Sequence, residues 1–120
     1  MPKAATANLE AAASLPEFIR QSMGSKPGRD LVSHVEKLDA ETRKYACNVS
    51  ALDAAVGSMR QLLAALGLAD NTVIIFTADN GMMIGDHGLR GKWLPYDSSI
   101  RVPLIVHDPR QPSAHRGNRR

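Results

Sequence analysis

A carboxylate and an amide stand side by side just after a short apolar run. The run, Val73–Phe76, contains only β-branched and aromatic residues, and Asp79, Asn80 and Gly81 follow it closely. In an open α/β sheet, ligands bind at the carboxyl ends of the strands, so these two side chains form a candidate ligand pair. Their oxygens are the hard donors that Ca²⁺ and Mg²⁺ prefer. Asp, Asn and Gly are also the commonest turn residues, so spacing alone leaves a metal site and a simple turn both open.

The residues around this pair form a longer pattern. Four motifs follow one another in order, namely Phe76–Gly81, Gly85–Gly88, Gly91-Lys92 and Arg101–Val106. Together they resemble the second half of the catalytic domain of a sulfatase, a family of the alkaline-phosphatase-like superfamily. The resemblance covers Tyr45 to about Arg110, with a weaker match at Leu15–Arg20. It implies an α/β fold: a partial, truncated, doubly wound sheet of the alkaline-phosphatase type.

The resemblance also implies roles for four residues. Asp79 and Asn80 match Ca²⁺ ligands of the family, where the cation polarises sulfate oxygens. Lys92 matches a lysine that contacts the sulfate, a task suited to a compact point charge. His87 matches a histidine near the mouth of the pocket in one branch of the family, although an imidazole that orders its loop through hydrogen bonds fits equally well. The implied substrate is a sulfate ester.

Several parts of the family's active site have no counterpart in the sequence. Sulfatases use a formylglycine made from the cysteine (in some, serine) of a Cys-x-Pro-x-Arg type motif, whereas Cys47 is followed by Asn-Val-Ser-Ala. We therefore interpret Cys47 as a buried packing thiol within a helix. The acidic pair that completes the metal site is also missing, and two ligands are too few for Ca²⁺, which takes about six to eight oxygens. We expect an interior fragment of a sulfatase with an incomplete Ca²⁺ site and no turnover on its own.

Two other functions stay open. The intact protein could hydrolyse phosphate or phosphonate esters, because the superfamily shares its sheet and its metal chemistry. Alternatively, the chain could be a non-catalytic remnant that serves as an interaction module. An aryl sulfate, a sulfated sugar and choline sulfate are all compatible substrates.

One long helix is predicted to support the strand that carries the site. Asp39 is a candidate N-cap and Gly67 a stop. Between them, apolar residues recur at steps of three and four, as on one face of a helix: Tyr45, Val49, Leu52, Val56, Met59, Leu63 and Leu66. A helix that leads directly into a strand is typical of a parallel, doubly wound sheet. Asp53, beside the apolar face, is interpreted as structural.

Both predicted strands, Val73–Phe76 and Arg101–His107, contain a continuous apolar run, which is typical of strands buried on both faces. Two strands and one helix nevertheless cover little surface. We therefore expect under-covered apolar faces that invite self-association or a complementing chain. Trp93 and Tyr96 are interpreted as packing anchors with polar tips.

Length and composition limit the remaining possibilities. The 120 residues allow one domain, which we divide into a weakly structured segment (1–38, with a loop at Gly24–Asp30), the partial catalytic domain (39–110) and a basic, flexible tail (111–120). A net charge of +3 without a basic stripe argues against a nucleic-acid partner, and no apolar run is long enough to span a membrane. The N-terminus lacks a signal-peptide pattern. This favours a cytoplasmic location for the chain as it stands, with a periplasmic or secreted parent enzyme still open.

Overall fold

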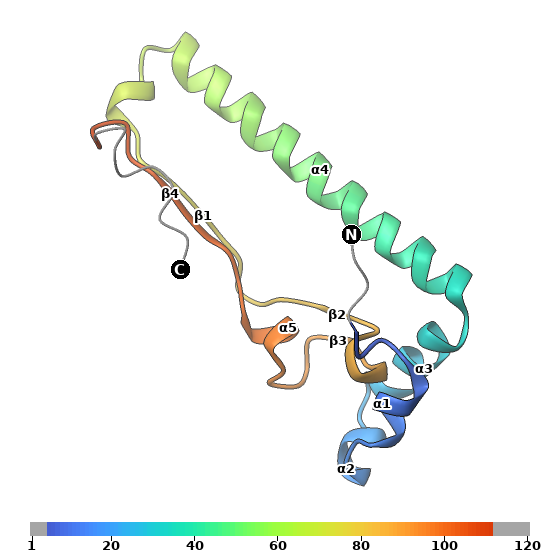
Figure 1. Ribbon diagram of the computed structural model, residues 1–120. Coiled ribbons are helices and arrows are strands. Elements are labelled where there is room, and N and C mark those ends of the chain that lie inside the picture. The colour runs from blue at the N-terminus through green and yellow to red at the C-terminus, as the bar shows by residue number, and fades with distance from the viewer. Residues whose placement is uncertain (1–4, 112–120) are drawn as a thin grey trace.

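The computed structural model describes residues 5–111 and shows an elongated molecule of 55 × 26 × 23 Å. Its elements in chain order are α1 (Leu9–Ala13), α2 (Glu17–Arg20), α3 (Ser25–Ser33), α4 (Val35–Ala65), β1 (Ile74–Thr77), β2 (Met83–Ile84), β3 (Arg90–Gly91), α5 (Asp97–Ile100) and β4 (Leu104–His107). Single 3₁₀ turns lie at Ala69–Asn71 and Asp86–Gly88. Helices α1–α3 and the β2/β3 pair gather at one end, while β1 and β4 extend away from it (Figure 1). No helix within the described residues is long and apolar enough to cross a membrane.

The long helix is confirmed, although it starts earlier than the sequence suggested. It begins at Val35, after the extended backbone of His34, and not at the predicted cap Asp39. Its end follows the prediction: Gly67 is left-handed at φ 68°. The N–H groups of Gly67 and Leu68 donate to the carbonyls of Ala64 and Leu63 at 3.1 and 2.9 Å. This is a Schellman motif, which satisfies carbonyls that the last turn leaves free.

The two four-residue strands form a sheet of their own. β1 and β4 pair antiparallel, with Ile74 opposite His107 and Thr77 opposite Leu104. The mixed α/β class is confirmed, but the parallel arrangement expected from the helix–strand order does not describe this pair. Between β1 and β4 the chain forms β2, the 3₁₀ turn Asp86–Gly88, β3 and the short α5, all at one end of the sheet. It therefore returns in the opposite direction without a crossover helix (Figure 1).

The prediction that both strands are buried on both faces is wrong for this chain. Ile75 is 64% exposed and Leu104 is 70% exposed, and apolar residues of α4, among them Leu52 and Leu62, are exposed as well. The reason is the small number of elements, because two strands and one helix cannot cover one another's outer faces. The expectation of under-covered apolar faces is therefore confirmed.

The core lies instead at the end of the molecule where helices α1–α3 and the β2/β3 pair gather (Figure 1). Leu15, Met83 and Leu89 are buried together, with Ile19, Leu94 and Tyr96 packed around them. Tyr96 thus behaves as the predicted packing anchor, whereas Trp93 is 63% exposed and does not.

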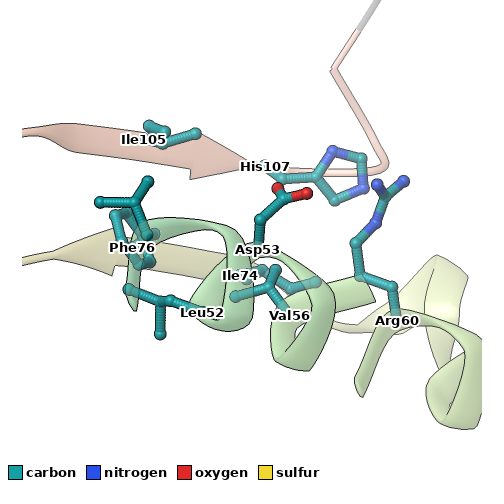
Figure 2. A pocket seen from close by; sticks show the side chains of 9 residues that line it. Leu52, Asp53, Val56, Arg60, Ile74, Phe76, Ile105 and His107 are labelled. Atoms are coloured by element: carbon teal, nitrogen blue, oxygen red, sulfur yellow. The ribbon is translucent and has the colours of Figure 1, made fainter. Parts of the chain in front are cut away.

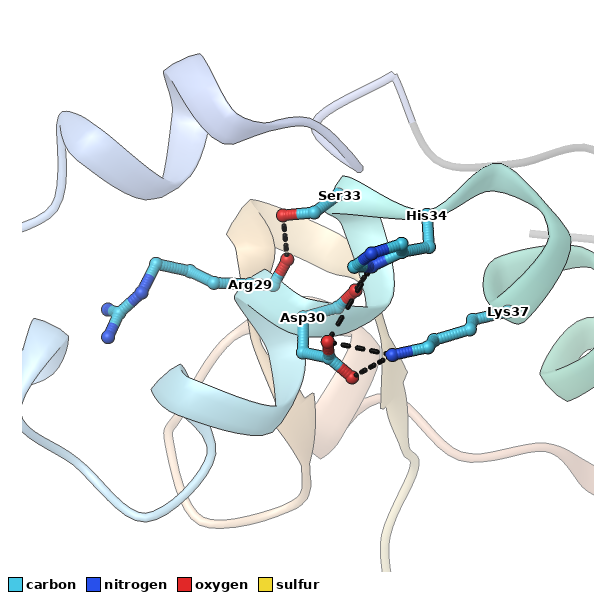
Figure 3. Close-up of polar contacts among 5 residues, drawn as sticks. All are labelled: Arg29, Asp30, Ser33, His34 and Lys37. Carbon is cyan, nitrogen blue, oxygen red and sulfur yellow. Dashed lines mark hydrogen bonds and ion pairs between the residues drawn. The ribbon is translucent and has the colours of Figure 1, made fainter.

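The segment Gly24–Asp30 is largely helical, where the sequence suggested a loop. Pro27 lies in the first turn of α3, where a missing N–H breaks no helical hydrogen bond. A Cβ at Gly28 would stand 2.3 Å from the carbonyl oxygen of Gly88, so glycine is needed for close packing of α3 against the 85–89 loop. Helix α3 is also tied to α4, since Lys37 donates to both carboxylate oxygens of Asp30 at 2.8 and 2.9 Å (Figure 3).

Candidate functional site

The candidate ligand pair emerges directly after β1. Asp79 and Asn80 follow the strand end at Thr77, and Gly81 comes next. The N–H of Gly81 donates to the carbonyl of Ser99 at 2.7 Å. A Cβ on Gly81 would lie 2.2 Å from the carbonyl oxygen of Ser98. Glycine is therefore required here because the backbone passes close to α5, which fixes the segment that carries the pair.

Asn80 and Lys92 meet although twelve residues separate them. The Lys92 ammonium donates to Asn80 Oδ1 at 3.0 Å, and the Asn80 amide group donates to the carbonyl of Gly81 at 2.8 Å. The second bond sets which way the amide faces, with its oxygen toward the lysine. Asn80 is half-buried and Lys92 exposed, so an anion can reach the ammonium from solvent.

Asp79 stands apart from this contact. Its side chain is exposed, and within residues 5–111 it makes no hydrogen bond or ion pair. The carboxylate is thus accessible to a ligand. Of the predicted site residues, the structure joins Asn80 to Lys92 directly and places Asp79 next to Asn80 along the chain.

The donor set fits Ca²⁺ in kind but not in number. The Asp79 carboxylate and the Asn80 amide oxygen are hard donors, but Ca²⁺ takes about six to eight oxygen ligands. The described part of the chain contains no group of three or more His, Cys, Asp or Glu side chains arranged to hold a metal. Residues 5–111 therefore do not bring together a complete Ca²⁺ shell.

His87 lies in a tightly turned loop between β2 and β3. Its backbone is left-handed at φ 53°, which is uncommon for a residue other than glycine. Its ring stacks on Tyr96 with the centroids 4.6 Å apart and the planes 28° from parallel. Asp86 steadies the same loop by accepting a hydrogen bond from the Ile84 N–H at 3.1 Å. The stack accounts for His87 as an ordered part of the loop.

Two further observations concern side chains outside this cluster. Asp97, in α5, and Arg101 form an ion pair at 3.4 Å. Cys47 is exposed on α4, so the interpretation as a buried thiol is wrong; the helix face that carries it is uncovered. Its position within a helix, away from any strand end, stands as predicted.

A hollow of about 450 Å³ lies between α4 and the β1/β4 sheet. Apolar side chains such as Leu52 and Phe76 form much of its wall, and Asp53, Arg60 and His107 add charged or polar groups (Figure 2). It shares no residue with the Asn80–Lys92 site.

The sequence did not reveal the contact that holds β3, the strand just before Lys92. Arg90, two residues before Lys92, pairs with Glu41 on α4 across 49 residues of sequence. No local pattern could reveal such a pair.

Comparison with known proteins gives consistent results. A family model described as Sulfatase matches residues 4–120. The chain is 34% identical to an N-acetylglucosamine-6-O-sulfatase of Bacteroides thetaiotaomicron over 72% of its own length and 15% of that protein. It is 42% identical to the iduronate 2-sulfatase of Mus musculus over 56% of its length and 12% of that protein.

One solved structure is similar as well. This structure shows BT4656 in complex with its substrate D-glucosamine-2-N,6-O-disulfate. Its protein chain is 32% identical to the present chain and superimposes on 78% of it with a TM-score of 0.58. That match covers 18% of the solved chain. The present chain therefore spans less than a fifth of each of these proteins.

Proposed function

The chain belongs to the sulfatase family, and from that premise we propose that it supplies part of the active site of an enzyme that hydrolyses sulfate esters. The observation that supports this most directly is the contact between the Lys92 ammonium and Asn80 Oδ1 at the end of β1. The oxygen that we assign to the cation and the ammonium that we assign to the anion are thus neighbours, an arrangement that suits the hydrolysis of a charged ester.

We assign Lys92 to the sulfate group. An ammonium carries three donors, so Lys92 can keep its bond to Asn80 while it donates to a sulfate oxygen. Because the ammonium is exposed and charged, it attracts the sulfate and offsets negative charge that develops on it during reaction. His87, held against Tyr96, contributes to the shape of the neighbouring loop.

We assign Asp79 and Asn80 to a divalent cation, Ca²⁺ by the resemblance, as two of its oxygen ligands. Such a cation polarises sulfate oxygens when it is bound. The amide oxygen of Asn80 has two lone pairs, so one can face the cation while the other accepts from Lys92. The remaining ligands and the formylglycine nucleophile would come from parts of the enzyme that these 120 residues do not include.

The substrate is proposed to be a sulfated sugar. The two relatives above are named for sugar or uronate substrates, and the solved structure holds a sulfated glucosamine. We further propose that the exposed apolar faces of α4, β1 and β4 are covered in the working enzyme, by the rest of the domain or by a second copy.

The test compares the 120-residue chain with a longer gene product that contains it. Both are assayed on p-nitrophenyl sulfate, glucosamine 6-sulfate and p-nitrophenyl phosphate. We expect no turnover by the chain, sulfate ester hydrolysis by the longer protein, and a loss of about 100-fold or more when Lys92→Ala removes a charged transition-state contact. Lys44→Ala, which removes an exposed lysine of α4, is the matched control and should keep full activity.

The outcomes separate the alternatives. Preference of the longer protein for the phosphate ester would place it elsewhere in the superfamily. Hydrolysis of neither ester by an intact, metal-loaded protein would favour the non-catalytic module. Strong sulfatase activity of the short chain, or full activity of the Lys92→Ala enzyme, would contradict the assignments made above.

A further inference from the structure

The strand that delivers Lys92 is held on three sides. β3 ends at Gly91, and Lys92 is the next residue. One side of β3 pairs with β2. On another side, the Arg90 N–H donates to the carbonyl of Gly24 at 3.0 Å, in an approach so close that a Cβ on Gly24 would stand 2.4 Å from Arg90 O. The third attachment is the side chain of Arg90.

That third attachment reaches the long helix. Arg90 Nη2 donates to Glu41 Oε1 in an ion pair, and the Glu41 side chain is only 24% exposed. Arg90 Nε is buried and has no hydrogen-bond partner among the described residues, although the side chain as a whole is 42% exposed. Glu41 is the carboxylate that pairs with this guanidinium. Lys44 lies 3.9 Å from the other Glu41 oxygen but is largely exposed, so it adds little.

The position of Lys92 depends on its backbone more than on its own side chain. A lysine has a flexible four-carbon stem, and the Lys92 side chain is exposed. Among the residues that the structure describes, its bond to Asn80 is the one contact that restricts the ammonium. If β3 shifts relative to α4, the ammonium moves away from Asn80 or spreads over many positions. Displacements of this kind lower the catalytic rate, because a group that binds the substrate must be held in place to act.

We propose that Glu41 is a positioning residue for Lys92. Its ion pair with Arg90 fixes β3 against α4 and thereby keeps the Lys92 ammonium at Asn80 Oδ1. The proposal rests on the function proposed above, because it concerns the geometry of that site, but it can be tested without any sulfate ester.

The test reads the side-chain amide of Asn80 by NMR in the ¹⁵N-labelled 120-residue chain. Lys92→Ala defines the signal position when the ammonium is absent. We expect Glu41→Gln to move the Asn80 side-chain signals at least halfway toward that position. Glu36→Gln, the same change five residues before Glu41 on α4 and at an exposed side chain, should leave them in place.

A second variant keeps the test decisive if Glu41→Gln perturbs the fold. The charge exchange Glu41→Arg with Arg90→Glu restores an ion pair of opposite orientation and should return the Asn80 signals toward their original position. The inference is overturned if Glu41→Gln folds and leaves those signals unmoved. It is equally overturned if the exchanged pair folds and leaves them at the Lys92→Ala position.

A separate titration with sodium sulfate distinguishes this inference from the proposed function. Shifts of the Asn80 and Lys92 signals on adding sulfate, with sodium chloride as the control, report on anion binding alone. Absence of those shifts would count against the sulfate contact, whereas the response to Glu41→Gln would still decide the role of Glu41.

Discussion

Replacing Gly28 by alanine should destabilise the protein, although alanine is the better helix former. An added Cβ would lie 2.3 Å from Gly88 O and 2.4 Å from Leu89 Cα, whereas ordinary contacts begin at 3.4 Å. Both neighbours are backbone atoms, so α3 and the 85–89 loop must separate by roughly 1 Å. That separation also loosens the packing of Leu89, which is fully buried.

The two opposing effects can be compared. Overpacking of this kind costs about 1–3 kcal/mol, and contacts this short favour the upper end. Alanine in place of a helical glycine returns about 1 kcal/mol. The net change for Gly28→Ala is therefore a loss of about 2 kcal/mol. At Gly57, in α4, an added Cβ meets no atom within 4 Å, so the same substitution should gain about 0.5–1 kcal/mol.

Urea unfolding followed by circular dichroism measures both values, and Gly57→Ala serves as the matched control. We expect the midpoint to fall by about 1–2 M for Gly28→Ala and to rise for Gly57→Ala. If Gly28→Ala alone is too unstable to measure, it is placed in the Gly57→Ala background. A Gly28→Ala protein as stable as the parent would show that α3 and the loop do not approach as closely as described.

Three further predictions concern other parts of the molecule. The hydrogen bond from Lys37 holds the pKa of Asp30 below its ordinary value of 3.8. The pair therefore stabilises the fold fully above pH 3.8, and this stabilisation is lost as the pH falls through the lowered pKa of Asp30. Lys37→Met should return the pKa toward 3.8 in a carboxyl NMR titration, and an unchanged titration would contradict the pairing. Tyr96→Ala should remove the ring-current shift of the His87 imidazole signals, whereas an unshifted spectrum would argue against the stack. Ile75→Lys, on an exposed strand face, should weaken self-association in sedimentation experiments; equal association of both proteins would locate the contact elsewhere.

Much of the local structure followed from the sequence. The spacing of apolar residues predicted the long helix, and Gly67 marked its end, because helix periodicity and a left-handed stop are short-range properties. The strand before Asp79 was equally visible as a β-branched run bounded by turn residues.

The failures of prediction share a physical cause. The segment Gly24–Asp30 has loop-like composition, yet most of it is helical because Pro27 falls in a first turn and Gly28 packs against another backbone. The burial of the strands was overestimated because burial depends on how many elements surround a strand, which its own residues do not encode.

For the site, the sequence by itself determined which groups are present: a carboxylate, an amide and an ammonium, with glycines between them. Only the tertiary structure decided which of them meet. It brought Lys92 to Asn80, left Asp79 facing solvent, and used Glu41 and Gly24 to hold the strand between them. Such contacts join residues far apart in the chain, and their geometry depends on how whole helices and strands pack, so no local pattern of residues could specify them.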